Sequence, residues 1–455
     1  MRGLLAASIL VLLLPGCVGA PLRPAATDAP SFSCVGPCKL PIDATAHSGW
    51  EPHAAVDPLD PQHVVVATRT LAATLPVNYV LWFDVHDSRD GGRTWNVTEL
   101  RYTEPMGTPS DPTAPNVVGD PVLAFLPDGT LLATGATLRY VSTPGGGVLT
   151  DVRLYSVRSP DGGRHFEEPV TVARSQGAGA EASLPVPLPS PPLFRTPDKP
   201  WLATGPDGTA LLTYTDIAGG EPSAPARRSD IAFVVSRDGG RSWSAPGFVA
   251  RGADLQGSAP AIGSEGAWYV GYVDLAARTA HVAASRDQGA TWTDRAVAPA
   301  DWMPSLAVAR ESGRERVLLV APAPQASGEM ESVPHAPTLS WSDDGGATWT
   351  APLPLDQPEA PGRILPSVAA DARGVVYVTF AHATAQGARM MAVALRPGSW
   401  RADLTLDPDI AAPPSSLGDY LGLAAGPAGA FAVWTTTKDG RSFDTAGALL
   451  SAEPL

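Results

Sequence analysis

Five copies of one short pattern constrain this chain more than any other feature of its sequence. Each copy has the form S-x-D-x-G-x-x-W, with Phe in place of Trp in the second copy. The copies are SRDGGRTW (88–95), SPDGGRHF (159–166), SRDGGRSW (236–243), SRDQGATW (285–292) and SDDGGATW (342–349). Such repetition within 455 residues indicates a repeat architecture, in which each unit is one supersecondary element that buries its apolar face against its neighbours.

The pattern has the chemistry of a tight hairpin turn. A carboxylate can accept backbone N–H bonds within the turn, glycine tolerates a positive φ, and the aromatic ring buries a large apolar surface beside it. We therefore assign a structural and not a catalytic role to the five aspartates, which are Asp90, Asp161, Asp238, Asp287 and Asp344.

These motifs resemble the Asp-box of the sialidase and BNR-repeat superfamily, and the resemblance covers nearly everything after Gly49. It implies an all-β fold, a β-propeller built from Asp-box repeats. It also implies that the Asp-box turns join the two outer strands of each blade, away from the face that binds ligand. The motif is specific for the fold and weak for the reaction.

A second periodic pattern predicts the number of blades. A proline opens an apolar strand whose fourth residue is small, as in Pro52 with Ala55, Pro121 with Ala124, Pro200 with Ala203, Pro260 with Gly263, Pro304 with Ala307 and Pro366 with Ala369. Small residues suit inner strands that crowd near a propeller axis. A seventh head follows at GDYLGLAAG, from Gly418, so seven blades are favoured. Six blades are the alternative, in which the last unit completes the first.

The last unit has room for only two further strands after its head. We therefore expect it to borrow its outer strand from residues near Lys39 to Ala46, which would tie the two ends of the chain together.

The N-terminus predicts export. Residues 1–16 contain Arg2 and a short apolar run, which is typical of a signal peptide. The string LPGC resembles a bacterial lipobox and makes Cys17 the lipidation site, so we expect a lipid-anchored protein of the cell envelope, with plain secretion as the alternative. Residues 17–48 are interpreted as a Pro/Ala-rich tether with a small disulfide loop between Cys34 and Cys38, and residues 49–455 as the propeller.

The charge composition of the chain disfavours some classes of binding partner. The chain has 46 acidic and 32 basic residues and a formal net charge of -14, which disfavours nucleic acid and an anionic membrane surface. Contact with a membrane is expected only through the lipid anchor. A monomer that meets an extracellular glycan or glycoprotein is the expected state.

Charged and aromatic residues stand at the blade heads, where loops enter the inner strands. Propellers usually bind ligands at that end, because the loops converge on the mouth of the central channel. Each residue taken alone is also explained by turn chemistry. Taken together they predict one funnel, formed by Glu51, Asp120, Asp198, Lys199, Asp301, Trp302, Arg363, Asp419 and Tyr420.

The family resemblance implies a particular set of catalytic groups. Sialidases use several arginines to clamp the substrate carboxylate, an Asp as acid and base, and a Tyr activated by Glu as the nucleophile. The candidates in this chain are Asp120 or Asp198 as the acid and Tyr420 as the nucleophile, with Arg69, Glu51, Lys199, Trp302, Arg363 and Asp419 in substrate binding. The chain departs from the family because it lacks an Arg-Ile-Pro signature before the first Asp-box. The most similar string in the chain is FRTP, which contains Arg195.

Two functional hypotheses follow from these features. The first is an exo-glycosidase of sialidase type that acts on extracellular glycans. The second is a non-catalytic propeller that binds glycan or protein at the cell surface, which the missing signature favours. No cofactor is required by either hypothesis, although the acidic funnel also suits a bound Ca²⁺.

Overall fold

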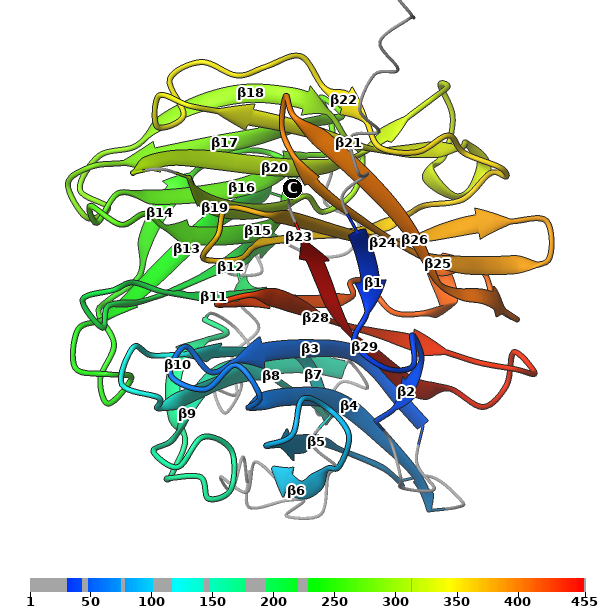
Figure 1. Cartoon of the computed structure of the whole chain (residues 1–455). Helices are drawn as coiled ribbons and strands as arrows, with labels where there is room; N and C mark the ends of the chain where they lie inside the picture. Colours follow the sequence, from blue (N-terminus) through cyan, green and yellow to red (C-terminus); the bar gives the residue numbers. More distant parts are fainter. Residues whose placement is uncertain are drawn as a thin grey trace, which may run out of the picture.

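Seven antiparallel blades, six with four strands and one with five, surround one axis in this computed structural model, which describes residues 31–42, 48–74, 78–100, 117–142, 148–176, 194–219, 228–311 and 313–453. Figure 1 shows the sheets following one another in chain order, from the blue strands of the first blade to the red strands of the last. The all-β propeller is therefore confirmed, with seven blades, and the six-bladed alternative is wrong.

In the first six blades, strands that follow one another in the chain lie in order from the inner edge to the outer edge. The first blade contains β3 (Ser48–Val56), β4 (Val64–Thr74), β5 (Asn78–Ser88) and β6 (Asn96–Leu100). The second contains β7 (Val117–Phe125), β8 (Leu131–Ser142), β9 (Val148–Ser159) and β10 (Val170–Arg174). The third contains β11 (Phe194–Thr204), β12 (Ala210–Gly219), β13 (Arg228–Ser236) and β14 (Gly247–Ala250).

The remaining blades follow the same order. The fourth contains β15 (Leu255–Ile262), β16 (Trp268–Asp274), β17 (Thr279–Ser285) and β18 (Thr293–Pro299). The fifth contains β19 (Ser305–Glu311), β20 (Arg314–Pro324), β21 (His335–Ser342) and β22 (Leu353–Pro354), with the 3-10 turn η1 (Met330–Ser332). The sixth contains β23 (Leu365–Ala370), β24 (Val376–Thr384), β25 (Gly387–Arg396) and β26 (Trp400–Ile410), followed by η2 (Pro414–Ser416).

The seventh blade is built from both ends of the chain. Its inner strands are β27 (Gly422–Gly426), β28 (Gly429–Thr436) and β29 (Asp444–Glu453), and its outer edge is β1 (Ser31–Cys34) with β2 (Leu40–Pro41). Both N-terminal strands pair with β29, and Figure 1 shows the dark blue β1 beside the dark red β29. The predicted borrowing therefore occurs, but most of the borrowed strand lies upstream of the expected residues 39–46.

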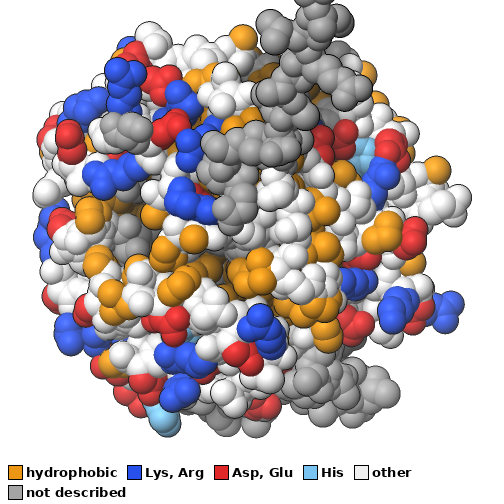
Figure 2. All heavy atoms as spheres, in the orientation of Figure 1, with side chains coloured by type: hydrophobic (Ala, Val, Ile, Leu, Met, Phe, Trp, Pro, Cys, Tyr) orange, Lys and Arg blue, Asp and Glu red, His pale blue; other side chains and the backbone are white. Residues whose placement is uncertain are grey.

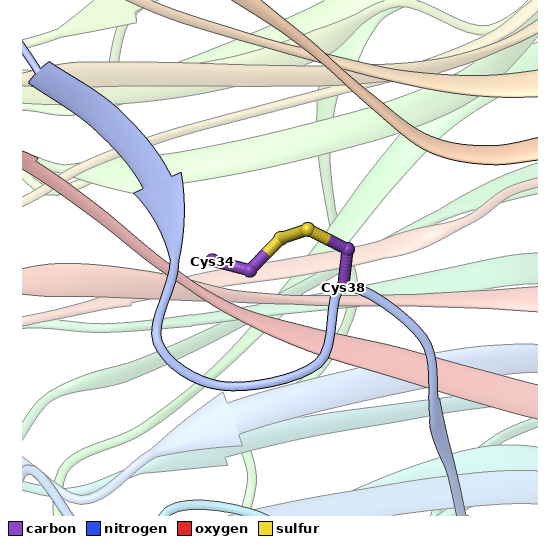
Figure 3. The surroundings of a disulfide bond; sticks show 2 residues. All are labelled: Cys34 and Cys38. Carbon is purple, nitrogen blue, oxygen red and sulfur yellow. A yellow bond between two sulfur atoms is a disulfide. The ribbon is translucent and has the colours of Figure 1, made fainter.

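The segment that joins these two outer strands is a closed loop. Cys34 and Cys38 form the disulfide expected from their spacing, and Figure 3 shows it bridging the turn between β1 and β2. Next to the loop, Lys39 pairs with the buried carboxylate of Asp407 at 2.6 Å and donates to Thr436 at 3.0 Å. The range 17–48 assigned to the tether thus includes two strands of the propeller, Ser31–Cys34 and Leu40–Pro41.

The core lies between neighbouring blades. One representative cluster joins Ala55 and Val65 of the first blade to Leu123 and Leu131 of the second, and all four are buried. Alternating apolar residues on both faces of each sheet produce such a cluster at successive interfaces, which is how a ring of sheets buries its surface. The described residues contain no helix with the length and apolarity that a bilayer crossing needs.

The Asp-box turns connect the third and fourth strands of the first five blades. In the first of them, Gly92 N–H donates to Ser88 Oγ at 2.8 Å, and Thr94 N–H donates to Asp90 Oδ1 at 2.9 Å. The hydroxyl of Thr94, which donates to Asp90 Oδ2 at 2.7 Å, and the Thr94 N–H contribute most to lowering the pKa of Asp90 to about 2. Gly92 has a φ of 88°, and a Cβ there would lie 2.8 Å from the ring of Phe431, so both conformation and space require glycine.

The surface charge is mixed. Figure 2, drawn in the orientation of Figure 1, shows acidic and basic side chains interspersed on this face despite the net charge of -14. Many carboxylates are paired with arginine, as in the bond from Arg316 Nε to Asp343 Oδ1 at 2.6 Å.

Removing the N-terminal strands tests whether they complete the fold. A chain that begins at Gly49 loses the six residue pairs with β29, four from β1 and two from β2. It also leaves the buried carboxylate of Asp407 without the ammonium of Lys39, with the bonds from Trp434 and Thr436 remaining, which is destabilising. We expect its melting temperature to fall by several degrees relative to a chain that begins at Ala20, as measured by circular dichroism. Equal melting temperatures would show that the borrowed strands do not contribute to stability.

Candidate functional site

The inner strands of the first four blades share one backbone irregularity at the end where the chain enters them. The pairing of each with its neighbour shifts register, between Trp50/His53, Gly119/Val122, Asp198/Trp201 and Gln256/Ala259. Within each bulge one residue adopts a left-handed conformation, namely Glu51 (φ 52°), Asp120 (φ 56°), Lys199 (φ 52°) and Gly257 (φ 61°). Three of these are charged residues, for which this conformation is strained.

The strained positions correct one detail of the predicted repeat. Pro52, Pro121 and Pro200 directly follow the left-handed residue, whereas the equivalent position in the fourth blade is Ser258. The predicted fourth head, Pro260 with Gly263, is therefore out of register by two residues. Glycine at position 257 matches the backbone requirement and places no charge in the funnel.

Lys199 lies at the centre of an acid cluster, which we define as Glu51, Asp120, Asp198 and Asp419. Its ammonium group lies 3.1 Å from Asp120 Oδ1 and also donates to Asp419 Oδ2. These contacts join the third blade to the second and to the loop before β27. Burial alone would lower the pKa of Lys199, but the surrounding carboxylates raise it well above its ordinary value, so the residue is a fixed cation.

Glu51 is the most buried acid of the cluster. The residue is 6 % exposed, and its carboxylate lies 3.6 Å from Arg69 Nη1. Gly418 packs closely against Glu51: a Cβ on Gly418 would lie 2.8 Å from Glu51 Cγ and 3.3 Å from its backbone nitrogen, so glycine is needed directly before Asp419. Burial, followed by repulsion from Asp120, raises the pKa of Glu51 to about 7.

The other acids of the cluster titrate differently. Burial and the neighbouring Asp120 raise the pKa of Asp198 to about 6. Burial acts in the same direction on Asp419, but Lys199 and Arg363 outweigh it and hold the pKa of Asp419 below its ordinary value. The site therefore holds a neutral acid and an ionised carboxylate side by side near pH 6 to 7, a separation typical of catalytic acid and base pairs.

Trp302 and Arg363 form what we call the rim, next to Asp419. The indole Nε1–H of Trp302 donates to the backbone oxygen of Asp419 at 3.2 Å, and Arg363 Nη1 donates to the Asp419 carboxylate at 3.2 Å. The guanidinium of Arg363 also lies over the Trp302 ring, 4.7 Å from its centre, and pairs with Glu331 at 2.8 Å.

Tyr420 lies beneath the acid cluster, in the floor of the site. The residue is 5 % exposed, and its hydroxyl donates to the backbone oxygen of Pro121 at 3.2 Å. Trp201 packs edge-on against its ring at 5.0 Å, and His53 packs in the same way against Trp201 at 5.2 Å. Burial raises the pKa of Tyr420 well above its ordinary value, so a reactive phenolate is disfavoured there.

The opposite wall is mostly apolar and includes three serines. The cavity beside Lys199 and Asp419 is lined on the other side by Gly257, Met303, Leu365 and other residues of blades four to six. A Cβ on Gly257 would lie 2.2 Å from Met303 Cγ, so Met303 fills the place that charged residues occupy in the first three blades. The site thus has one charged half and one apolar half.

Most of the residues predicted from the heads meet in this site. The acid cluster, Lys199, Arg69, Trp302, Arg363 and Tyr420 are within one network, whereas Asp301 points away from it toward Arg278 and His335. Sequence reasoning missed Trp201 and Met303, although both flank a head proline (Pro200 and Pro304). It also missed Glu331, which lies in η1 and has no periodic signal.

The positive charge at the centre of the site comes from Lys199. In the ranges that the structure describes, no three His, Cys, Asp or Glu side chains are arranged to hold a metal ion. The ammonium of Lys199 lies among the carboxylates that, from the sequence, suit a bound Ca²⁺.

Comparisons with known proteins support the propeller fold and nothing finer. No family model and no curated protein sequence matches this chain. Among solved structures, a protein of unknown function from Dyadobacter fermentans is 15 % identical, with 93 % of this chain and 99 % of that chain covered at a TM-score of 0.51. The GH93 α-L-arabinofuranosidase of Fusarium graminearum with arabinobiose is 15 % identical, with 79 % and 97 % covered and a TM-score of 0.51.

A third structure extends this likeness. The α-L-arabinanase of Penicillium chrysogenum with arabinobiose is 12 % identical, with 93 % of this chain and 99 % of that chain covered at a TM-score of 0.51. These likenesses support the propeller fold expected from the Asp-box motifs.

Replacing Glu51 with Gln tests whether a neutral acid is buried here. The folded-state pKa of about 7 lies above the ordinary value of 4.5, so the folded protein binds this proton more tightly. The free energy of unfolding is therefore highest at low pH. It falls by up to about 3 kcal/mol as pH rises from about 4.5 to about 7. Glu51→Gln removes this loss. Its melting temperature should match the native protein at pH 4 and exceed it at pH 8.

An exposed glutamate provides the control. Glu265→Gln lies on the surface and should leave the melting temperature unchanged at both pH values. A difference between Glu51→Gln and the native protein that does not vary with pH would contradict the buried neutral acid.

Proposed function

We propose that this protein is a glycoside hydrolase that acts on a neutral glycan. The observation that carries the proposal is the acid cluster, in which one environment raises the pKa of Glu51 to about 7 and lowers that of Asp419. Glycoside hydrolysis needs two carboxyl groups in opposite protonation states, one to protonate the leaving oxygen and one to act on the other side of the sugar.

The residues divide into roles by their environments. Glu51 is the general acid, because it retains its proton near neutral pH, and Asp198 is the second candidate for that role. Asp419 is the ionised carboxylate, which activates water or stabilises the developing positive charge on the sugar. Lys199 keeps Asp419 ionised and fixes the positions of the Asp419 and Asp120 carboxylates. Tyr420 supports the floor and takes no part in bond breaking.

A neutral substrate fits the electrostatics better than a sialoside. The described residues bring two arginines to the site, Arg69 and Arg363, and both already pair with carboxylates. An acidic sugar would meet Glu51, Asp120, Asp198, Asp419 and Glu331 without a free arginine clamp. The sialidase arrangement of several arginines with an exposed Tyr is therefore not the one we propose.

Two further observations support a neutral glycan as the substrate. The apolar half of the site, with Met303 and Leu365, suits the less polar face of a sugar ring, while the charged half suits its hydroxyl groups. Structures of similar fold include an α-L-arabinofuranosidase and an α-L-arabinanase with arabinobiose, which is a neutral disaccharide. Arabinose-containing glycans are therefore the first substrates to test.

Export remains part of the proposal. The disulfide between Cys34 and Cys38 suits an oxidising compartment, which supports a site of action outside the cytoplasm. The signal peptide and the lipidation site Cys17 lie outside the described residues. We propose a monomer anchored to the cell envelope through Cys17.

Hydrolysis assays test the proposed reaction. The chain from Ala20 onward should release fluorophore from a neutral glycoside such as 4-methylumbelliferyl α-L-arabinofuranoside, and not from the matching α-sialoside. Glu51→Gln and Asp419→Asn should each lower kcat/KM by about 100-fold or more, since general acid catalysis contributes that much. The kcat/KM of the native protein should fall as pH rises through about 7, where Glu51 loses its proton.

The surface variant Glu265→Gln should retain full activity. Hydrolysis of the sialoside alone would contradict the neutral substrate. Absence of hydrolysis across neutral glycosides, with retained binding of arabino-oligosaccharides in calorimetry, would instead support the non-catalytic propeller.

A further inference from the structure

His335 joins two loops that the candidate site depends on. The residue opens β21 and is 1 % exposed. Its Nε2 lies 2.8 Å from Asp301 Oδ1, and its Nδ1 lies 2.8 Å from the backbone oxygen of Gly362. Each ring nitrogen of His335 thus has a hydrogen-bond partner on a different loop.

The two partners precede the two residues of the rim. Asp301 is followed by Trp302 in the loop between β18 and β19, and Gly362 is followed by Arg363 in the loop between β22 and β23. One side chain therefore fixes both loops at the residue before the one that contacts Asp419.

Neighbouring contacts restrict the same two loops. Arg278 donates to the second carboxylate oxygen of Asp301 at 2.7 Å, so both oxygens of this acid are engaged. Gly362 N–H donates to Val333 O at 3.0 Å, and an isolated bridge joins Gly362 to Pro334. The segment that leads into His335 thus holds Gly362 through its backbone, while the imidazole reaches across to the other loop.

We infer that His335 is a positioning residue that sets the distance between Trp302 and Arg363 and aims both at Asp419. The inference rests on the proposed function, because the rim would then be the part of the site that holds the glycan next to the acid cluster. His335 does not contact the acid cluster in any hydrogen bond of the described residues, so its effect on substrate passes through the rim.

A second buried histidine in the chain provides a matched control. His63 has no exposed side-chain surface, and its ring nitrogens face Asp57 and Asp87, each at 2.8 Å, with Gly162 O at 3.0 Å. It lies in the turn between β3 and β4, at the end of the blade that carries the Asp-box turns and away from the acid cluster. Loss of His63 should affect packing without affecting the rim.

The experiment compares His335→Gln with His63→Gln in the chain from Ala20 onward. With tryptophan labelled with ¹⁵N, the indole N–H signal of Trp302 is assigned by its absence in Trp302→Phe. We expect His335→Gln to shift this signal, because the bond from Trp302 to Asp419 changes, and we expect His63→Gln to leave it in place. An unmoved Trp302 signal in folded His335→Gln would overturn the inference.

A functional measurement adds the link to substrate. With a substrate that the native protein hydrolyses, His335→Gln should raise KM by about tenfold with a smaller change in kcat, and combining it with Trp302→Phe should cost less than the two separate effects together. Additive effects would overturn the positioning role. Should the native protein hydrolyse nothing, the proposed function fails while the Trp302 signal still decides the inference.

A milder variant covers the case in which His335→Gln does not fold. Asp301→Asn keeps an acceptor for the His335 ring but removes the charge that Arg278 and His335 share. It should shift the Trp302 signal in the same direction by a smaller amount, and an unchanged signal would count against the inference.

Discussion

The ion pairs of Lys199 are the interaction on which the candidate site depends. Its ammonium group contacts Asp120 of the second blade and Asp419 of the loop before the seventh, so one side chain joins three units of the ring near the axis. Burying a single unpaired charge is costly, and burying four carboxylates without a cation would be more so. The ammonium of Lys199 offsets the cost of burying the acid cluster in the folded state. Glu51 is then the acid of the cluster that carries a proton.

Backbone strain explains how these side chains reach one point. Glu51, Asp120 and Lys199 share a bulge position and a left-handed conformation, which costs of the order of 1 kcal/mol or more for each non-glycine residue. The same bulge holds Gly257 in the fourth blade, where no charge is presented and Met303 fills the space. The division of the site into a charged half and an apolar half thus follows from which residue each blade places at one repeated position.

The fold was largely predictable, because turn chemistry is local. The Asp-box motifs and the small residues of the heads predict seven blades, and the residues at the heads do gather in one site. What failed depends on contacts between distant segments. The pairing of Ser31–Cys34 with β29, the two-residue shift at Pro260 and the burial of Tyr420 under Trp201 are all set by tertiary packing. His335 carries no periodic signal, and only its two partners reveal its place.

The most direct test of the central claim is the protonation state of Glu51 itself. Infrared difference spectroscopy between the native protein and Glu51→Gln reports the C=O stretch of a protonated carboxyl group. The account predicts a band that is present at pH 6, is lost as pH rises through about 7, and is absent from the variant. A native spectrum without this band at pH 6 would show that Glu51 is ionised and would contradict its role as the acid of the site.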